Sequence, residues 1–327
     1  MANDFAAALT QLDDVAWTQI VNELQASIHP VDRTATHIWF AFFPVKLWRA
    51  LTTSGDVAAT MKKLTIKGQP LLREQVDTSA AFLYGYKYWP QVKTAVSEYA
   101  ASATAGQPIA AQIKTVAQRV AAQVNASESL LLGITAVAFG TLQQVGAELF
   151  KQPAAANDYS QRWNRPADQV VADRRKDDSQ GLFGFLKSVD KTFTVNIREG
   201  VPGYTFKALN DQDVTMAAQQ VPASQYAQDA RCKVGEGALP VECRSAACGT
   251  CWVGVLSPTE KLSPPNQRER DRWRYFGYEG FTGEADSPIR LACQLKARGN
   301  ATLVVPPWCG LIGKLDAPEE TASAASA

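Results

Sequence analysis

The sequence has very few of the residues on which most hydrolytic catalysis depends. Among 327 residues there are only two histidines, His29 and His37, and the formal net charge is only +1. A Ser–His–Asp arrangement therefore has little support. A chain so close to neutral also lacks the positive field of a general polyanion binder. We expect a protein without its own hydrolytic chemistry and without a nucleic-acid partner.

Signals for export and for membrane insertion are also missing. The opening stretch, MANDFAAALTQLDD, is acidic where a secretory signal needs basic residues, and no apolar core follows it. No run reaches 18 uninterrupted apolar residues. These absences predict a cytoplasmic protein with no transmembrane span.

Cysteine is absent from the first 231 residues, and all six cysteines lie between Cys232 and Cys309. Three of them, Cys243, Cys248 and Cys251, fall within the nine residues CRSAACGTC. In a reducing cytoplasm, closely spaced thiols bind metals or carry out redox chemistry more often than they form disulfides. The chemistry of this chain is therefore expected in its C-terminal third.

Length and composition predict two domains in an α+β protein. The chain is too long for one ordinary core, and 46% hydrophobic with 20% charged residues is typical of a globular protein. We expect a helical bundle at 1–152, a linker with a possible docking element (residues 182–186) at 153–190, an α+β domain at 191–314 and a frayed tail at 315–327.

Helical spacing supports the first of these regions. Asp13 and Asp14 can cap a helix whose apolar face carries Trp17, Val21 and Leu24. Apolar residues at steps of three and four predict another helix over 109–124. A third helix is expected over 128–150, and its apolar middle, LLLGITAVAFG, indicates burial among other helices.

Beyond residue 192 the pattern changes to short strands. TFTVNI and YTFKAL predict a strand pair, DVTMAAQQV a helix, CWVGVL a strand, LSPPNQRERDRWRYF a second helix and ATLVVPP a final strand. IRLACQ is another β-like run, and it places Cys293 at a strand end. Together with the cluster of three, Cys293 gives C-x4-C-x2-C followed by a distant cysteine, the spacing of plant-type [2Fe–2S] centres.

This part of the sequence resembles a bacterial [2Fe–2S] ferredoxin domain with a β-grasp fold, from about residue 192 to 308. The matching words are PVECRSAACGTC, LSPP at 262–265 and RLACQ at 290–294. The resemblance implies that Cys243, Cys248, Cys251 and Cys293 hold a [2Fe–2S] cluster and that the chain transfers single electrons, at about −400 mV for plant-type centres. It also implies redox partner proteins, a reductase or an oxidase.

The chain also departs from the ferredoxin pattern. Residues 191–327 contain fifteen Lys or Arg and fifteen Asp or Glu, whereas plant-type carriers are usually strongly acidic. The 41 residues between Cys251 and Cys293 are a long interval. The partner surface is therefore expected to differ from the usual acidic one.

Other interpretations of the cysteines stay open at this point. A structural zinc site favours two C-x2-C motifs, whereas this sequence has one. A Rieske centre needs two histidines near the cysteines. The thiols could also be merely buried. Cys232 and Cys309 fall outside the spacing and are interpreted as spare buried thiols, with a reserve ligand or redox-reactive thiol as the alternative.

Three aromatic groups remain to be explained. HIWFAFFPVKLW and FLYGYKYW are interpreted as core, with docking, a membrane-surface contact or a quinone pocket as alternatives. DRWRYFGYEGF, which contains Trp273 and Phe276, is expected to shield one side of the cluster from water. His29 and His37 are expected to form local hydrogen bonds and not to bind metal.

The sequence therefore favours an electron-transfer protein whose helical domain docks the redox partner. No strand followed by G-x-G-x-x-G is present, as a flavin reductase would need, and no second cysteine set follows Cys293. The alternatives are a redox sensor, in which the state of the cluster controls partner binding by the helical domain, and a structural subunit of a larger redox complex.

Overall fold

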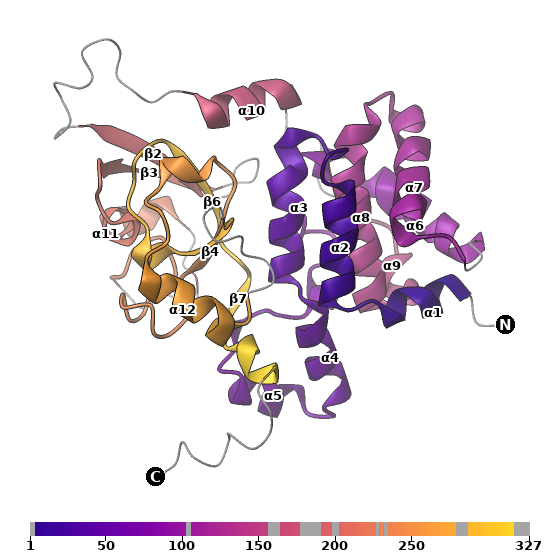
Figure 1. Ribbon diagram of the computed structural model, residues 1–327, viewed down its shortest axis with the longest axis horizontal. Coiled ribbons are helices and arrows are strands. Elements are labelled where there is room, and N and C mark those ends of the chain that lie inside the picture. The colour runs from indigo at the N-terminus through magenta and orange to yellow at the C-terminus, as the bar shows by residue number, and fades with distance from the viewer. Residues whose placement is uncertain are drawn as a thin grey trace.

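The structure is a computed structural model, which describes residues 4–102, 106–155, 164–176, 191–197, 203–226, 229, 231, 235–278 and 287–316. Figure 1 shows a helical part formed by the first half of the chain and a sheet-containing part formed by the second half, lying side by side. The expected α+β class is confirmed.

The helical part is built around α8 (Glu128–Val145). Every residue of α8 from Leu131 to Gln143 is buried, as its apolar middle predicted, and α3, α6 and α7 pack against it. The remaining elements of this part are α1 (Asp4–Gln11), α2 (Asp14–Leu24), α3 (Pro30–Phe42), α4 (Val45–Thr53), α5 (Val57–Lys63), η1 (Leu72–Glu74), η2 (Tyr84–Tyr88), α6 (Trp89–Ser102), α7 (Ile109–Val124) and α9 (Ala147–Phe150).

Side-chain caps and special backbone angles set the ends of these helices. The Asp13 side chain accepts a hydrogen bond from Ala16 N at 2.8 Å and starts α2. Asn125 adopts the left-handed conformation at the end of α7. Gly146, at φ 78°, separates α8 from α9. The single helix expected over 128–150 is therefore two helices.

The sheet has five strands in the order β3-β2-β6-β4-β5. The hairpin strands β2 and β3 are antiparallel, β2 runs parallel to β6, and β4 is antiparallel to both β6 and β5. This order, with one parallel central pair and a helix after the hairpin, is a β-grasp arrangement. Its elements are β2 (Thr192–Ile197), β3 (Tyr204–Leu209), α11 (Val214–Gln219), η5 (Ala223–Gln225), β4 (Trp252–Val255), η6 (Thr259–Lys261), α12 (Gln267–Phe276), β5 (Ile289–Leu291), η8 (Ala292–Gln294) and β6 (Ala301–Val304).

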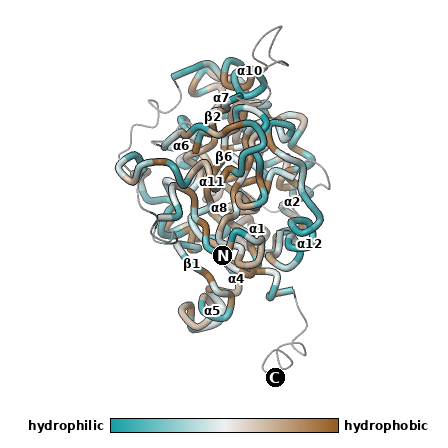
Figure 2. Tube along the Cα trace, turned by 90° about the vertical axis from the view of Figure 1, so that its left-hand side faces the viewer, coloured by the Kyte–Doolittle hydropathy of each residue, from teal (hydrophilic) through white to brown (hydrophobic). Residues whose placement is uncertain are grey.

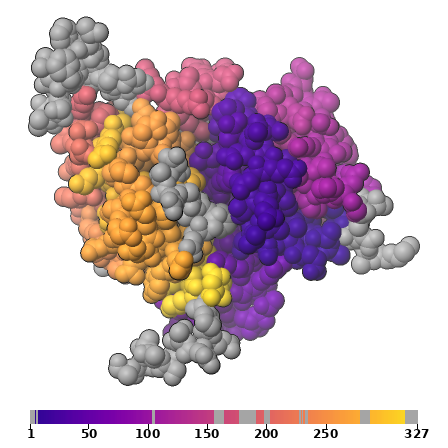
Figure 3. All heavy atoms as spheres, viewed as in Figure 1, coloured from indigo at the N-terminus to yellow at the C-terminus, as the bar shows by residue number. Residues whose placement is uncertain are grey.

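The two parts share one continuous hydrophobic core. A Cβ on Gly254 of β4 would lie 2.6 Å from the Ile38 side chain of α3, so that the strand and the helix are in close contact. The Trp308 indole donates a hydrogen bond to Phe42 O at 2.7 Å. In Figure 3 the yellow end of the described chain also lies against the purple segment of the helical part, where Lys46 pairs with Asp316 at 2.6 Å.

A short strand from the helical part joins the C-terminal part directly. β1 (Lys67–Gly68) pairs antiparallel with β7 (Trp308–Cys309), and Lys67 lies opposite Cys309. Gly68 has φ 89°, and a Cβ there would lie 2.3 Å from Pro307 O. Only glycine allows this approach of the two backbones. The strand pair was not predicted from the sequence.

Part of the expected linker is helical. α10 (Ala167–Arg175) lies at the top of Figure 1 and packs on α3, and the Arg174 guanidinium donates to Val31 O at 2.6 Å. The expected docking element, 182–186, and tail residues 317–327 lie outside the described residues. Residues 312–315 of the C-terminal stretch form η9 (Ile312–Leu315).

The two aromatic groups of the helical part lie in its core, as the favoured interpretation predicted. Trp39 and Trp89 are fully buried and Phe42 is 1% exposed. Figure 2 shows hydrophobic segments gathered inside the molecule around α8 and β6. None of the helices in the described ranges combines the length and the hydropathy needed to cross a bilayer.

The two histidines lie apart. The Nδ1 atom of His29 accepts from Val31 N at 3.2 Å and caps α3, and its Nε2 atom lies 3.2 Å from Asp168. His29 thus forms local hydrogen bonds, as expected. His37 differs, because its buried Nε2 atom has no hydrogen-bond partner within the described ranges.

Candidate metal centre

Cys243, Cys248 and Cys251 lie in one tightly curled loop that leads into β4. Three residues of this loop have positive φ: Arg244 at 54°, Ala246 at 61° and Gly249 at 68°. The first two are not glycine, and a side chain in this conformation costs roughly 1–2 kcal/mol. Backbone strain of this kind is often found at functional sites.

The curled backbone directs its N–H groups at sulfur. Cys243 Sγ accepts from Ala247 N and from Cys248 N, both at 3.3 Å, and from Ser245 N at 3.5 Å. Successive inward N–H groups form a concavity that favours negative charge, and many iron–sulfur sites use one. Burial alone would raise the pKa of Cys243, but hydrogen bonds from the backbone and side chains of Ser245 and Cys248 outweigh burial and lower that pKa to about 6. The loop therefore favours a thiolate at Cys243.

The structure brings the four predicted cysteines together in two pairs. The Cys248 thiol donates to the Cys243 sulfur, and the Cys251 thiol donates to the Cys293 sulfur. The bond from Cys251 is the main cause that lowers the pKa of Cys293 to about 7, and it raises the pKa of Cys251 itself. The two pairs also interact electrostatically, because the charge of Cys248 raises the pKa of Cys251 and the charge of Cys243 raises the pKa of Cys293.

The two pairs differ in burial. Cys251 and Cys293 are 3% and 6% exposed, whereas Cys243 and Cys248 are half-buried. Ser245 and Ala247, on either side of Ala246, are exposed. The loop therefore has an inner sulfur pair against the core and an outer pair near the surface.

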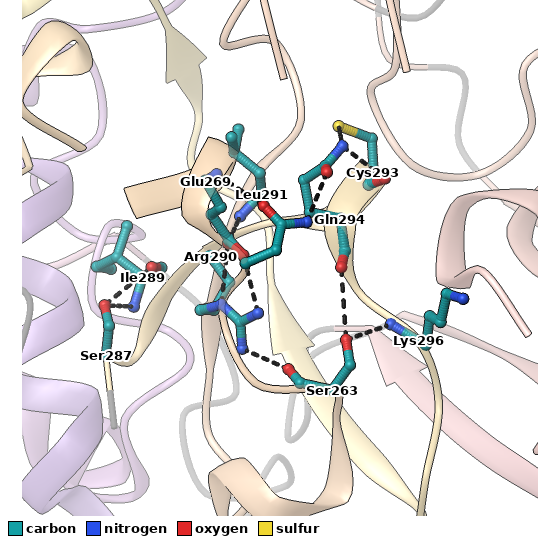
Figure 4. Close-up of polar contacts among 10 residues, drawn as sticks. Ser263, Glu269, Ser287, Ile289, Arg290, Leu291, Cys293, Gln294 and Lys296 are labelled. Carbon is teal, nitrogen blue, oxygen red and sulfur yellow. Dashed lines mark hydrogen bonds and ion pairs between the residues drawn. The ribbon is translucent and has the colours of Figure 1, made fainter. Parts of the chain in front are cut away.

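Polar contacts from the α12 region hold the segment that carries Cys293, as Figure 4 shows. The Gln294 side-chain amide donates to Cys293 Sγ at 3.3 Å and accepts from Asn266 Nδ2 at 2.9 Å. Asn266 is also the N-cap of α12 and accepts from Glu269 N at 2.8 Å. The helix start and the fourth cysteine are thereby linked through one amide side chain.

A buried ion pair lies directly behind this segment. Arg290 and Glu269 are 1% and 0% exposed, and both arms of the pair, Nε–Oε1 and Nη2–Oε2, measure 2.9 Å. Glu269 also accepts from Leu291 N at 2.7 Å, and Arg290 donates to Ser263 O at 3.0 Å. This geometry ties α12 to β5, the strand that ends two residues before Cys293. Sequence reasoning missed the pair, because Glu269 lies in the arginine-rich run RERDRWR.

Aromatic rings close the other side of the loop. A Cβ on Gly249 would lie 2.2 Å from the Phe276 ring, so α12 packs directly against the loop. Phe276 and Tyr278 are fully buried and pack edge-on against Trp252, and Trp273 is 5% exposed. Tyr275 is 44% exposed. Phe281, the last ring of this group, lies outside the described residues, and the shielding role stays a prediction.

A charged side chain from the helical part also reaches the loop. Lys67 Nζ of β1 lies 2.8 Å from Glu242 Oε2, and Glu242 accepts from Thr250 Oγ1 at 3.0 Å. The hydrogen bond that Lys67 donates to Glu242 is the main cause that raises the pKa of Lys67, and the charges of Cys309 and Cys248 add to it. The sequence held no signal for this contact, because it joins residues 175 positions apart.

The two remaining cysteines lie outside the four-thiol group. Cys309 is 2% exposed in β7 and within hydrogen-bonding reach of Thr250, which fits the spare buried thiol of the sequence prediction. Cys232 lies outside the described residues.

The donor set fits a two-iron cluster better than a single metal ion. Across the described ranges, no group of three or more His, Cys, Asp or Glu side chains is arranged to hold one ion. A two-iron cluster makes a different demand: it needs four cysteine ligands, which are shared between its two irons. The two thiol pairs and the inward N–H groups meet that demand.

Comparison with known protein families agrees with this geometry. Residues 210–298 match the family model described as the 2Fe-2S iron-sulfur cluster binding domain. All four predicted cysteines fall within the matched residues. A comparison with solved structures gives no match. The C-terminal part of this chain is therefore a 2Fe-2S iron-sulfur cluster binding domain, and a [2Fe–2S] cluster is its cofactor.

Proposed function

We propose that this chain is a one-electron carrier whose single [2Fe–2S] cluster is bound by Cys243, Cys248, Cys251 and Cys293. The observation that carries the proposal is the convergence of these four thiols, in two pairs, from a loop and a separate strand end. When bound, the cluster supplies reversible one-electron oxidation and reduction.

The surroundings of the thiols support a carrier that exchanges electrons at the outer edge of the loop. Cys251 and Cys293 are enclosed by the core, whereas Cys243 and Cys248 lie near the exposed residues Ser245 and Ala247. A partner seated on this edge would come closest to the cluster. On the other side, the core around the inner pair would exclude water from the cluster. This exclusion lowers the local dielectric there.

In this proposal the helical part also contributes to partner docking. Lys67 is half exposed beside the loop, and Lys62 and Lys63, in the last turn of α5, are exposed nearby in the chain. A partner on the outer edge of the loop would therefore meet positive charge from the helical part. An acidic redox protein, a reductase or an oxidase, suits this surface.

Electron transfer from the holoprotein tests the carrier directly. We expect the anaerobically reduced protein to reduce a one-electron acceptor such as ferricyanide with a stoichiometry of one electron per chain, and to be reduced again by a ferredoxin reductase. The Cys293→Ser variant, which removes an inner sulfur, should lose this capacity, whereas Cys309→Ser should retain it. A holoprotein that exchanges no electrons with any reductase or oxidase would refute the carrier.

A redox sensor is the second candidate, and the β1–β7 contact favours it. Lys67 links the helical part to Glu242, the residue before Cys243, so that a change of cluster charge acts on a group of the helical part. The measurement is the affinity for a partner, once one is found by co-purification, with the cluster oxidised and reduced. Equal affinities would exclude the sensor and leave the carrier unaffected.

A further inference from the structure

A cavity of about 830 Å³ lies between the two parts of the chain, away from the thiol loop. β4 joins the two places, because Cys251 precedes its first residue and Val255, its last, lines the cavity. α2, α3 and α10 form the opposite wall, and Figure 1 shows α10 above the junction of the two parts. The volume falls in the range of small-molecule sites, which often lie at domain interfaces.

The helical wall of the cavity is positively charged. Arg33 of α3 and Arg174 and Arg175 of α10 line it, and among its described lining residues Glu260 is the only carboxylate. Neither Arg33 nor Arg175 forms an ion pair within the part of the chain that the structure describes. An uncompensated guanidinium in a recess attracts anions more strongly than one on an open surface.

The wall formed by β4 and the residues after it combines apolar side chains with the polar Ser257, Thr259 and Glu260. Val255, Leu256, Pro258 and Pro288 contribute to it, and Val171 of α10 adds a further apolar group. A bare inorganic anion would leave these apolar side chains uncovered. A ligand with a charged end and an apolar body would use both walls.

Two of the buried polar atoms that line the cavity lack a hydrogen-bond partner among the residues that the structure describes. They are Arg33 Nε and His37 Nε2, and both residues line the cavity. Buried polar atoms in native structures nearly always have a partner, from the protein, from ordered water or from a ligand. Because these two atoms lie in the same wall as Arg33 and Arg175, they are a second sign that this wall receives a polar group.

We propose that this cavity binds a small organic anion, a carboxylate or a phosphate monoester with an apolar body. The charged end lies toward Arg33 and Arg175, and the apolar body lies against the end of β4 and Pro288. The site touches both parts of the chain, so an occupied cavity stabilises their association. The proposal does not depend on the electron-transfer function.

Calorimetric titration of the full-length holoprotein tests this proposal with three probes. Octanoate combines a carboxylate with an aliphatic body, adenosine monophosphate combines a phosphate with a flat base, and inorganic phosphate is the charge alone. The variants are Arg33→Gln and Arg175→Gln. The control is Arg119→Gln, which removes an exposed arginine of α7 that pairs with Glu98. The visible spectrum of each variant shows whether the cluster domain is intact. Because Arg175 is exposed, Arg175→Gln does not disturb the core.

We expect octanoate or adenosine monophosphate to bind with a dissociation constant below about 1 mM. Binding should weaken at least tenfold in Arg33→Gln and Arg175→Gln and stay unchanged in Arg119→Gln. Failure of both organic probes to bind, or equal affinity in all variants, would overturn the proposal. Inorganic phosphate binding as tightly as the organic probes would also overturn it, since the apolar side chains of the cavity would then have no role.

Discussion

Gly249 shows how a single residue shapes the thiol loop. Its φ of 68° favours glycine, and a Cβ there would lie 2.2 Å from the Phe276 ring. We expect Gly249→Ala to push the loop away from α12 and to lower the yield of bound cluster, measured as iron and acid-labile sulfide per chain.

Gly55 is a matched control for this substitution. It has φ 70°, but nothing lies within 4 Å of the position of its Cβ. Gly55→Ala therefore carries the backbone strain, roughly 1–2 kcal/mol, without the collision. Equal cluster content in the two variants would show that the contact with Phe276 is unimportant.

The buried Glu269–Arg290 pair predicts a large effect on stability. Glu269→Gln leaves the Arg290 charge buried without its carboxylate, and breaking such a pair costs about 3–5 kcal/mol. Urea denaturation, followed by circular dichroism, measures the loss. Asp211→Asn is the control, because it breaks the pair with Arg298, in which both side chains are about half exposed, and it should cost about 1 kcal/mol or less. A similar small loss in both variants would contradict the role given to the buried pair.

At the scale of elements, the strand pair β1–β7 connects the helical part to the thiol loop. We expect Lys67→Met to lower the reduction potential, because a positive charge near the cluster stabilises its more negative, reduced form. An interaction of about 0.2–1 kcal/mol, as for partly exposed pairs, corresponds to roughly 10–40 mV for one electron. Lys62→Met, on exposed α5, is the control. An unchanged reduction potential in Lys67→Met would show that this residue of the helical part does not influence the cluster.

Elements differ in how well the sequence predicts them. Helix α2 was predictable because Asp13 and the spacing of Trp17, Val21 and Leu24 act within one turn or two. The four cysteines could be proposed as a ligand set from the sequence because three of them lie in nine residues and the strand pattern around Cys293 is local. The β-grasp order followed from the resemblance of the cysteine motif.

Contacts between distant segments could not be predicted in this way. β1 has only two residues, too few for any periodicity, and its partner lies more than 230 residues later. Glu269 gave no sign that it would be buried, because its neighbours in RERDRWR are charged. The break at Gly146 was missed because both flanking helices, α8 and α9, continue one apolar pattern.

At the scale of the whole molecule, the continuous core predicts that the two parts unfold together. We expect cluster loss, followed by visible absorbance, and helix loss, followed by far-ultraviolet circular dichroism, to show coincident transitions in urea. Two separate transitions, with the cluster lost well before the helices, would show that the parts fold independently as the sequence-based boundaries at 152 and 191 suggested.

We propose that Cys243, Cys248, Cys251 and Cys293 together hold one two-iron cluster. The most direct test is an iron and acid-labile sulfide analysis of anaerobically purified protein, combined with electron paramagnetic resonance after reduction. We predict two irons, two sulfides and a single-electron signal per chain, all lost in Cys243→Ser and Cys293→Ser and all retained in Cys309→Ser. Protein that contains no labile sulfide would exclude the cluster, and a full cluster that persists in Cys293→Ser would exclude Cys293 as a ligand.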